Sequence, residues 1–354
     1  MTISLCMIVK NEEAVLARCL TSAKTAVDEI IIVDTGSTDA TKTVAAQFTD
    51  RIYDFGWVDD FSAARNFSYS LATMEYQMWL DADDVLPEGS AVKLRELKET
   101  VDPAADLITM KYITQFDEHG NAVFSTTRER LTRTSKKYLW QDPVHECIPL
   151  TGHVFHSGIE VHHKRIEKNE RKERNLNIYT ALEQSGRPLS PRQQYYFARE
   201  LKDHSQWAKA AYYFERFLDS GKGWHEDNIA ACFNLSLCYH ALGTHYKIMP
   251  ILTKSFEYDT PRAEICTQIG YYYKRIQNFA TALKWFRLAA RLDPPDSIGF
   301  ILHDYWGYIP YIEACVCAYQ LGDRESAIQY NEQAAVYKPQ DKTVEYNRRA
   351  LQAI

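Results

Sequence analysis

The sequence has 354 residues, of which 41 are basic, 47 are acidic and 45% are hydrophobic, with a formal net charge of −6. This length predicts two domains. The acidic balance disfavours a nucleic-acid-binding protein, and no apolar run is long enough for a membrane span. The short N-terminal apolar run lacks the layout of a signal peptide. The eight scattered cysteines show no zinc-type spacing, so we expect buried, reduced thiols in a cytoplasmic protein.

The first 110 residues alternate short runs rich in Val and Ile with segments of helical periodicity, and further strand-like runs follow up to residue 165. This pattern predicts an α/β domain over residues 1–165, with a Rossmann-like, largely parallel sheet covered on both faces. We expect helices after the first two strands and over 61–73, and antiparallel pairing among the last strands. The expected strands are 3–9, 29–34, 51–55, 76–80, 106–114, 122–133 and 158–163.

Polar residues follow three of these strands directly: Asn11-Glu12, Asp34-Thr35 and Asp81-Ala82-Asp83. Ligands of open α/β sheets bind beyond the carboxyl ends of the strands, so these residues are predicted to share one crevice. Two carboxylates as close as Asp81 and Asp83 repel each other unless a cation lies between them. A hard divalent ion bridging to phosphate oxygens would supply it.

The alternative interpretation of the acidic run is a helix N-cap with first-turn acids, because a helical pattern follows. We assign Asp84 to that role.

From about residue 176 the strand pattern gives way to aromatic-rich helices. A 34-residue frame starting at Ala263 has small or aromatic residues at the tetratricopeptide positions. These are Gly270, Tyr273, Ala282, Phe286, Ala289 and Pro294, and partial copies of the frame start at Ile229 and Tyr308. We therefore predict an all-α tetratricopeptide-like domain over 190–354, interrupted by an insertion at 295–307. A charged linker or helix over 166–189 would join the two domains.

The motif order of residues 1–165 resembles family 2 glycosyltransferases of the GT-A fold. The resemblance implies a nucleotide-sugar-binding domain in which Val9, Asn11, Glu12 and Asp34 hold the uracil and ribose of a UDP-sugar. Many members have a second acid after the one that matches Asp34, whereas this sequence has Thr35. The resemblance therefore does not imply the base contact that this second acid makes in the family.

The resemblance also implies a metal site. Asp83 would be the main ligand of Mg²⁺ or Mn²⁺, while Asp81 and Ala82 would contact the donor. Arg65 matches the family arginine near the pyrophosphate. The alternative interpretation is that Arg65 is an ordinary residue on a helix surface. A histidine from a late strand often completes the metal site, and His162 matches that motif better than His163.

Transfer to a hydroxyl or thiol requires a base that removes its proton. The segment 140–148 resembles the family segment that ends in His-Glu, which implies Glu146 as base and His145 as part of the pocket. Asp81 would assist from the donor side, and Asp142 is the reserve base. Direct attack with one carboxylate base would invert the sugar carbon. The alternative for Glu146 is a structural salt bridge.

A family 2 domain joined to tetratricopeptide repeats resembles the peptide glycosyltransferases of glycocin biosynthesis. The resemblance implies transfer of glucose or N-acetylglucosamine from a UDP-sugar to a peptide or protein side chain, with the acceptor held in the concave groove of the repeats. Alternatively, the repeats form a homodimer or only cover the catalytic domain. Two further hypotheses are a polysaccharide or lipid-linked acceptor and a non-catalytic repeat scaffold with a degenerate transferase domain.

Overall fold

The computed structural model describes residues 1–166 and 173–352. The chain divides into two compact units, Met1–Arg187 and Pro188–Ile354. The linker expected at 166–189 falls partly on 167–172, which lie outside the described residues. Part of the remainder is a helix of the first unit, α5 (Arg174–Gln184).

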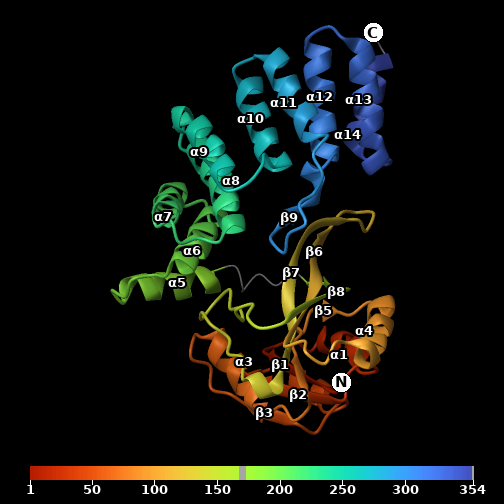
Figure 1. Ribbon diagram of the computed structural model, residues 1–354, viewed down its shortest axis with the longest axis vertical. Helices are drawn as coiled ribbons and strands as arrows, with labels where there is room; N and C mark the ends of the chain where they lie inside the picture. The colour runs from red at the N-terminus through yellow and green to blue at the C-terminus, as the bar shows by residue number, and fades with distance from the viewer. Residues whose placement is uncertain (167–172, 353–354) are drawn as a thin grey trace. The chain divides into compact units, whose positions relative to one another are not determined.

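The first unit contains a mixed sheet with helices packed on it (Figure 1). Its eight strands follow the order β3-β2-β1-β4-β7-β6-β8-β5, parallel from β3 to β4 and in the pair β6–β8, and antiparallel elsewhere. The strands are β1 (Ile3–Val9), β2 (Glu29–Asp34), β3 (Ile52–Asp54), β4 (Tyr76–Met78), β5 (Asp84–Val85), β6 (Leu107–Phe116), β7 (Ala122–Arg133) and β8 (Val154–His163). The helices before α5 are α1 (Leu16–Ala23), α2 (Thr41–Ala45), α3 (Phe61–Ser70) and α4 (Glu88–Thr100).

The strand order places a crevice at the edge where β1 and β4 end. The chain winds outward from β1 to β2 and β3 on one side, and returns to β4 on the other. The connections after β1 and β4 therefore diverge, and such a reversal of strand order opens a crevice at the carboxyl ends of the strands. The parallel strands β1 and β2 are apolar along most of their length because side chains cover both faces of the sheet.

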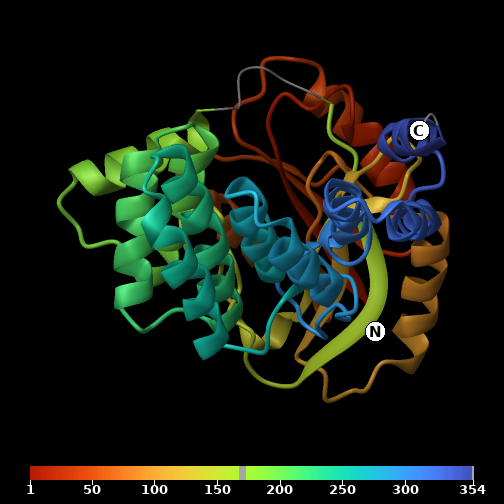
Figure 2. The same cartoon turned by 90° about the horizontal axis from the view of Figure 1, so that it is seen from above.

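The second unit is a series of antiparallel helix pairs, which Figure 2 shows one after another from green to blue. Its helices are α6 (Pro191–Asp203), α7 (Trp207–Asp219), α8 (His225–Ala241), α9 (Ile248–Lys254), α10 (Ala263–Arg275), α11 (Phe279–Ala289), α12 (Tyr308–Gln320), α13 (Arg324–Tyr337) and α14 (Lys342–Gln352), with a short strand β9 (Ile301–Leu302) before α12. None of the described helices is both long and apolar enough to cross a membrane.

Small residues let paired helices approach in the repeat that starts at Ala263. A Cβ atom at Gly270 of α10 would lie 2.5 Å from Cε1 of Phe286 in α11, closer than carbon atoms pack. Phe286 is completely buried there. The tetratricopeptide frame therefore has a steric basis, because only glycine leaves room for this ring.

A buried acid in the same repeat makes stability depend on pH. Burial raises the pKa of Glu264 to about 7, and its Oε2 atom has no hydrogen-bond partner. Between the ordinary pKa of 4.5 and about 7, the folded chain keeps a proton that the unfolded chain has lost, so stability falls as pH rises through this window.

We expect the free energy of unfolding of Glu264→Gln to exceed that of the wild type by no more than about 1 kcal/mol at pH 5 and by about 2–3 kcal/mol at pH 8. Urea titrations of the helical circular dichroism signal at both pH values would measure this. An equal difference at pH 5 and pH 8 would contradict the role of the carboxylate charge.

Candidate active site

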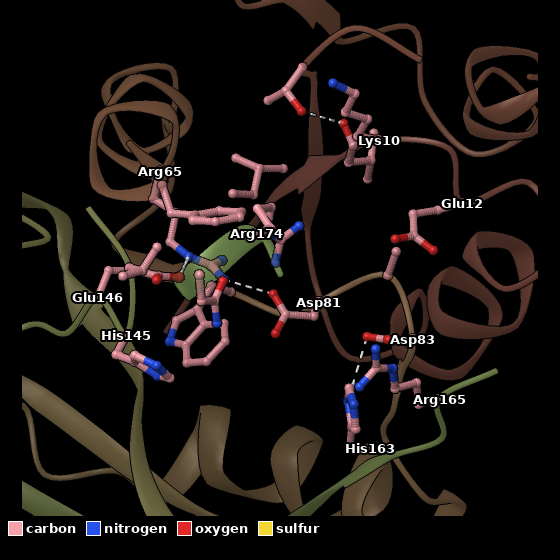
Figure 3. Close-up of a pocket in the computed structure, with 18 of the residues that line it drawn as sticks. Lys10, Glu12, Arg65, Asp81, Asp83, His145, Glu146, His163, Arg165 and Arg174 are labelled. Atoms are coloured by element: carbon pink, nitrogen blue, oxygen red, sulfur yellow. Dashed lines mark hydrogen bonds and ion pairs between the residues drawn. The ribbon is translucent and has the colours of Figure 1, made fainter. Parts of the chain in front are cut away.

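A cavity of about 530 Å³ in the first unit opens beyond the carboxyl ends of β1 and β4 (Figure 3). Most of the residues singled out from the sequence lie in its wall. They are Val9, Asn11, Glu12, Arg65, Asp81, Ala82, Asp83, His145 and Glu146. Asp34 and His162 do not line the cavity. One site thus gathers side chains from four separate segments of the chain.

The acidic run forms a tight turn that directs two carboxylates into the cavity. Trp79 and Leu80 remain buried after β4, so the chain turns only at Asp81. The backbone N–H of Asp84 donates to the carbonyl oxygen of Asp81 at 3.0 Å, and Asp84 Oδ2 accepts the N–H of Asp81 at 3.0 Å. These two hydrogen bonds fix the loop, leaving Asp81 and Asp83 to face the cavity (Figure 3).

Asp84 does not cap a helix, contrary to the prediction. Helix α4 begins after Pro87 and has no side-chain cap. Asp84 is completely buried and forms a 3.0 Å ion pair with Arg130 of β7, which is also completely buried. It also accepts a hydrogen bond of 2.8 Å from the hydroxyl of Tyr112. Its role is therefore to anchor the turn at residues 81–84 to the buried interior of the domain.

The structure places His163, and not His162, beside Asp83. Nδ1 of His163 lies 3.5 Å from Asp83 Oδ1. Successive side chains of a strand point to opposite faces, so His162 on β8 is turned away, where its Nε2 lies 3.2 Å from Glu160 and its ring contacts Phe116. The sequence favoured His162 over His163 as the metal-site histidine, whereas the structure places His163 at that position.

Asp83, Asp84 and His163 form the group of possible metal ligands in the described part of the chain. Each offers one ligand atom, and these atoms lie within 4.8 Å of one another. Because Arg130 and Tyr112 already engage Asp84, the cavity-facing members are Asp83 and His163.

Arg65 joins the two sides of the cavity. Its Nη2 atom lies 2.7 Å from Asp81 Oδ1, and its Nε atom lies 2.7 Å from Glu146 Oε1 (Figure 3). The guanidinium also lies over the rings of Trp79 and Trp140, at 4.6 and 4.9 Å. Arg65 is buried, so it is not a helix-surface residue.

Asn66, the neighbour of Arg65 on α3, holds the segment that carries Glu146. Its amide donates to the carbonyl oxygen of Trp140 at 3.1 Å, and its Oδ1 accepts the Trp140 N–H at 2.8 Å. The segment closes with a bridge between Gln141 and Cys147. Two adjacent residues of α3 therefore position this segment: Arg65 holds the side chain of Glu146, and Asn66 holds the backbone at Trp140.

Burial and neighbouring charges shift the pKa values of Asp81 and Asp83 in opposite directions. Burial raises the pKa of Asp81, but the charge and hydrogen bond of Arg65 outweigh it and lower that pKa to about 2. Burial raises the pKa of Asp83, and repulsion by Asp81 and Asp84 adds to the effect despite the nearby His163. Burial lowers the pKa of His163, but hydrogen bonding to Asp84 and the nearby carboxylates raise it overall. A concentration of negative charge thus remains around Asp83.

The loops after β1 and β2 hold each other. Asn11 Oδ1 accepts the N–H of Thr38 at 2.8 Å, and Asn11 itself has a left-handed backbone with φ of 54°. Asp34 Oδ1 accepts the N–H groups of Gly36 and Ser37 at 2.9 and 2.8 Å, whereas its buried Oδ2 has no hydrogen-bond partner. An acceptor of this kind is suited to a donor group on a ligand.

Helix α5 supplies a part of the wall that sequence reasoning missed. Arg174 and Asn175 line the cavity, and the Arg174 guanidinium lies 4.4 Å from the Phe61 ring centroid. The ring of Tyr179 stacks on His145 with centroids 6.1 Å apart. No pattern in the sequence pointed to these positions, because the segment 166–189 is predicted only to join the two domains, as a linker or helix. The other cavity residues that were missed are Ile8, Lys10, Trp57, Phe61, Tyr112, Arg128, Val144 and Arg165.

Two family models match parts of the chain, one in each unit. Residues 4–160 match the model described as glycosyl transferase family 2, and residues 263–296 match a tetratricopeptide repeat model. The second match begins at Ala263, so the predicted repeat frame is confirmed.

Individual relatives match different parts of the chain. A TPR repeat-containing protein of Synechococcus elongatus is 37% identical over 146 residues, which cover 41% of this chain and 35% of the relative. The glycosyltransferase SunS of Bacillus phage SPbeta is 26% identical over 302 residues, covering 80% of this chain and 69% of SunS. The match to the Synechococcus protein thus spans about a third of that relative's length.

Among solved structures, glucosyl-3-phosphoglycerate synthase from Mycobacterium tuberculosis, in complex with Mn²⁺ and UDP-glucose, superimposes with a TM-score of 0.36. It is 15% identical, and the match covers 53% of this chain and 80% of that one.

Proposed function

The chain carries a family 2 glycosyltransferase domain followed by tetratricopeptide repeats, and from this premise we propose a metal-dependent, inverting transfer of glucose or N-acetylglucosamine from a UDP-sugar to a peptide or protein side chain. The observation that carries the proposal is one cavity in which Asp83 and His163 face Glu146, with Arg65 and Asp81 between them.

The donor set suits a divalent metal ion. Asp83 and His163 would hold Mg²⁺ or Mn²⁺, with His163 taking the role first assigned to His162, because one carboxylate oxygen and one imidazole leave positions for diphosphate oxygens and water. Burial and the neighbouring carboxylates raise the pKa of Asp83, and a bound cation would offset both effects. Such an ion would neutralise negative charge on the departing diphosphate.

The nucleoside would lie on the loops after β1 and β2. Val9, Asn11 and Glu12 would form the wall against the base and ribose, and Asp34, whose Oδ1 holds the Gly36–Ser37 turn, would support this wall from behind the cavity. Asp81, kept ionised by Arg65, would contact the donor sugar from its place between the Arg65–Glu146 pair and Asp83.

Glu146 would take the proton from the acceptor. Its Oε1 is fixed by Arg65 and its backbone carbonyl oxygen accepts the Arg128 Nη2–H at 3.1 Å, so the carboxylate is held at the cavity wall. The same ion pair would serve the alternative, structural interpretation of Glu146. His145, stacked on Tyr179, would shape the neighbouring wall.

The overall activity is tested by incubating the protein with UDP-glucose and with UDP-N-acetylglucosamine in the presence of Mn²⁺. Release of UDP in the absence of acceptor, abolished by a chelator and restored by added metal, is the expected result. Release of UDP at an unchanged rate in the presence of the chelator would refute metal dependence. Absence of UDP release from both donors would refute the donor class.

We expect Glu146→Gln to reduce turnover by about 10²–10⁴-fold, the usual contribution of a general base. UDP binding, measured by calorimetry, should stay within about twofold because the amide still accepts a hydrogen bond from Arg65. Asp142→Asn is the matched control, since Asp142 lies on the same segment but does not line the cavity. Normal turnover in Glu146→Gln would assign Glu146 to the structural ion pair alone.

A further inference from the structure

The insertion between the last two predicted repeats interrupts an otherwise regular spacing. The repeat frames at Ile229 and Ala263 start 34 residues apart, whereas Ala263 and Tyr308 are 45 apart, an excess of 11. Accordingly, 18 residues separate α11 from α12, while five separate α7 from α8. Loops of that length inside a compact domain usually have a function of their own.

The first helices of successive pairs form one continuous row in the second unit. Helix α6 contacts α8, α8 contacts α10, and α10 contacts α12. In tetratricopeptide stacks, the curvature of the array turns such a row into an extended concave surface that binds ligands. We call this row, α6-α8-α10-α12, the inner face.

The insertion lies on the inner face and touches three of its helices. The Arg199 guanidinium of α6 lies 4.3 Å from the ring centroid of Phe300. A Cβ atom at Gly299 would lie 3.0 Å from Oε2 of Glu226 in α8, so the backbone of the insertion runs directly along this carboxylate. The adjacent residues Gly299 and Phe300 of the insertion therefore lie against two neighbouring helices, α8 and α6 respectively.

The following residues of the insertion continue across the same face. The ring of Tyr305 meets Phe233 of α8 edge-on, with centroids 5.7 Å apart, and the amide of Gln268 in α10 donates to its hydroxyl at 3.4 Å. The segment thus places Phe300 against α6, the backbone of Gly299 against α8, and Tyr305, from the 3₁₀ turn His303–Tyr305, against α8 and α10, as a bound peptide would.

The end of the insertion is anchored firmly. Trp306 is buried against Ala263, Cys266 and Ala289, and Asp304 forms a 2.7 Å ion pair with Lys338. Because the segment is tethered next to the surface that it covers, its effective concentration there is high, and a free peptide must compete with it.

We infer that residues 295–307 are a built-in ligand of the inner face, which is therefore a binding surface for an aromatic-containing peptide that the chain itself supplies. This inference goes beyond the proposed transfer reaction and does not depend on it. A peptide acceptor would then bind outside the part of the inner face formed by α6, α8 and α10, in contrast to the groove expected from the sequence.

The test removes the ligand and adds it back. Deleting residues 297–307 restores the 34-residue spacing, and the probe is a fluorescent peptide with the sequence of residues 295–307. We expect saturable binding to the shortened chain, at least tenfold weaker binding of the same peptide with Phe300→Ala and Tyr305→Ala, and no binding to the intact chain. A shortened chain of normal helicity that binds neither peptide, or both equally, would overturn the inference.

A second measurement uses the full chain, in case the shortened one does not fold. Phe300→Ala is expected to raise hydrogen exchange over 295–302 by at least tenfold, because it removes the contact with Arg199. Ile276→Ala is the control, since Ile276 is 59% exposed in the same unit. Unchanged protection of 295–302 in Phe300→Ala would equally overturn the inference.

Discussion

Asp83→Asn is expected to lower Mn²⁺-dependent release of UDP from UDP-glucose by roughly 10²–10⁴-fold, because the metal contributes several kcal/mol to stabilising the leaving diphosphate. The fold should survive, since the carbonyl oxygen of residue 83 still accepts the N–H of Lys164 at 2.8 Å. Electron paramagnetic resonance of Mn²⁺ in the presence of UDP would measure loss of the ion independently of turnover.

The two adjacent histidines provide a matched control for this experiment. His163→Ala should weaken Mn²⁺ binding by about 10–100-fold, as expected for loss of a metal ligand or its close support. His162→Ala should leave it nearly unchanged, because that side chain faces Glu160 and Phe116. Full activity of Asp83→Asn, or equal effects of the two histidine variants, would remove this metal site from the proposal.

Arg130→Met is expected to destabilise the first unit by about 3–5 kcal/mol, the usual cost of leaving a buried charge unpaired. The guanidinium of Arg130 is enclosed by the rings of Trp79 and Tyr112, at 3.7 and 4.3 Å, and it pairs with Asp84, so methionine would keep the volume and remove the charge. The midpoint of urea unfolding, followed by tryptophan fluorescence, would measure the loss.

Two further variants separate charge from packing. Arg130→Met combined with Asp84→Asn should recover part of the lost stability, because the unpaired carboxylate is gone. Arg348→Met breaks the exposed pair with Glu332, and it should cost no more than about 1 kcal/mol. If Arg130→Met were as mild as Arg348→Met, the anchoring role of the buried pair would be wrong.

The strands and the repeat frame could be predicted because local pattern determines them. Runs of Val and Ile between turn residues predicted 3–9 and 29–34 with the bounds that β1 and β2 have, and the strand predicted over 122–133 has the bounds of β7. The repeat at Ala263 was recognisable because helix packing requires a small residue at Gly270 opposite Phe286.

Features of the site that depend on distant contacts could not be predicted in this way. The role of Asp84 depends on Arg130, which lies 46 residues away. The orientation of His163 depends on the pairing of β8 with the two-residue strand β5, in which Asp84 lies opposite His163 and Val85 opposite His162. No local signal in the sequence reports such a register.

The wall contributed by α5 determines how the first unit can be isolated. A fragment ending at residue 165, where the motifs end, would lack Arg174 and Asn175 and would expose His145, which loses the ring of Tyr179. A fragment extending through Arg187 keeps all three. Expression of the first unit for crystallisation or ligand screening should therefore use the longer boundary, because the shorter one yields a protein with an open-sided pocket.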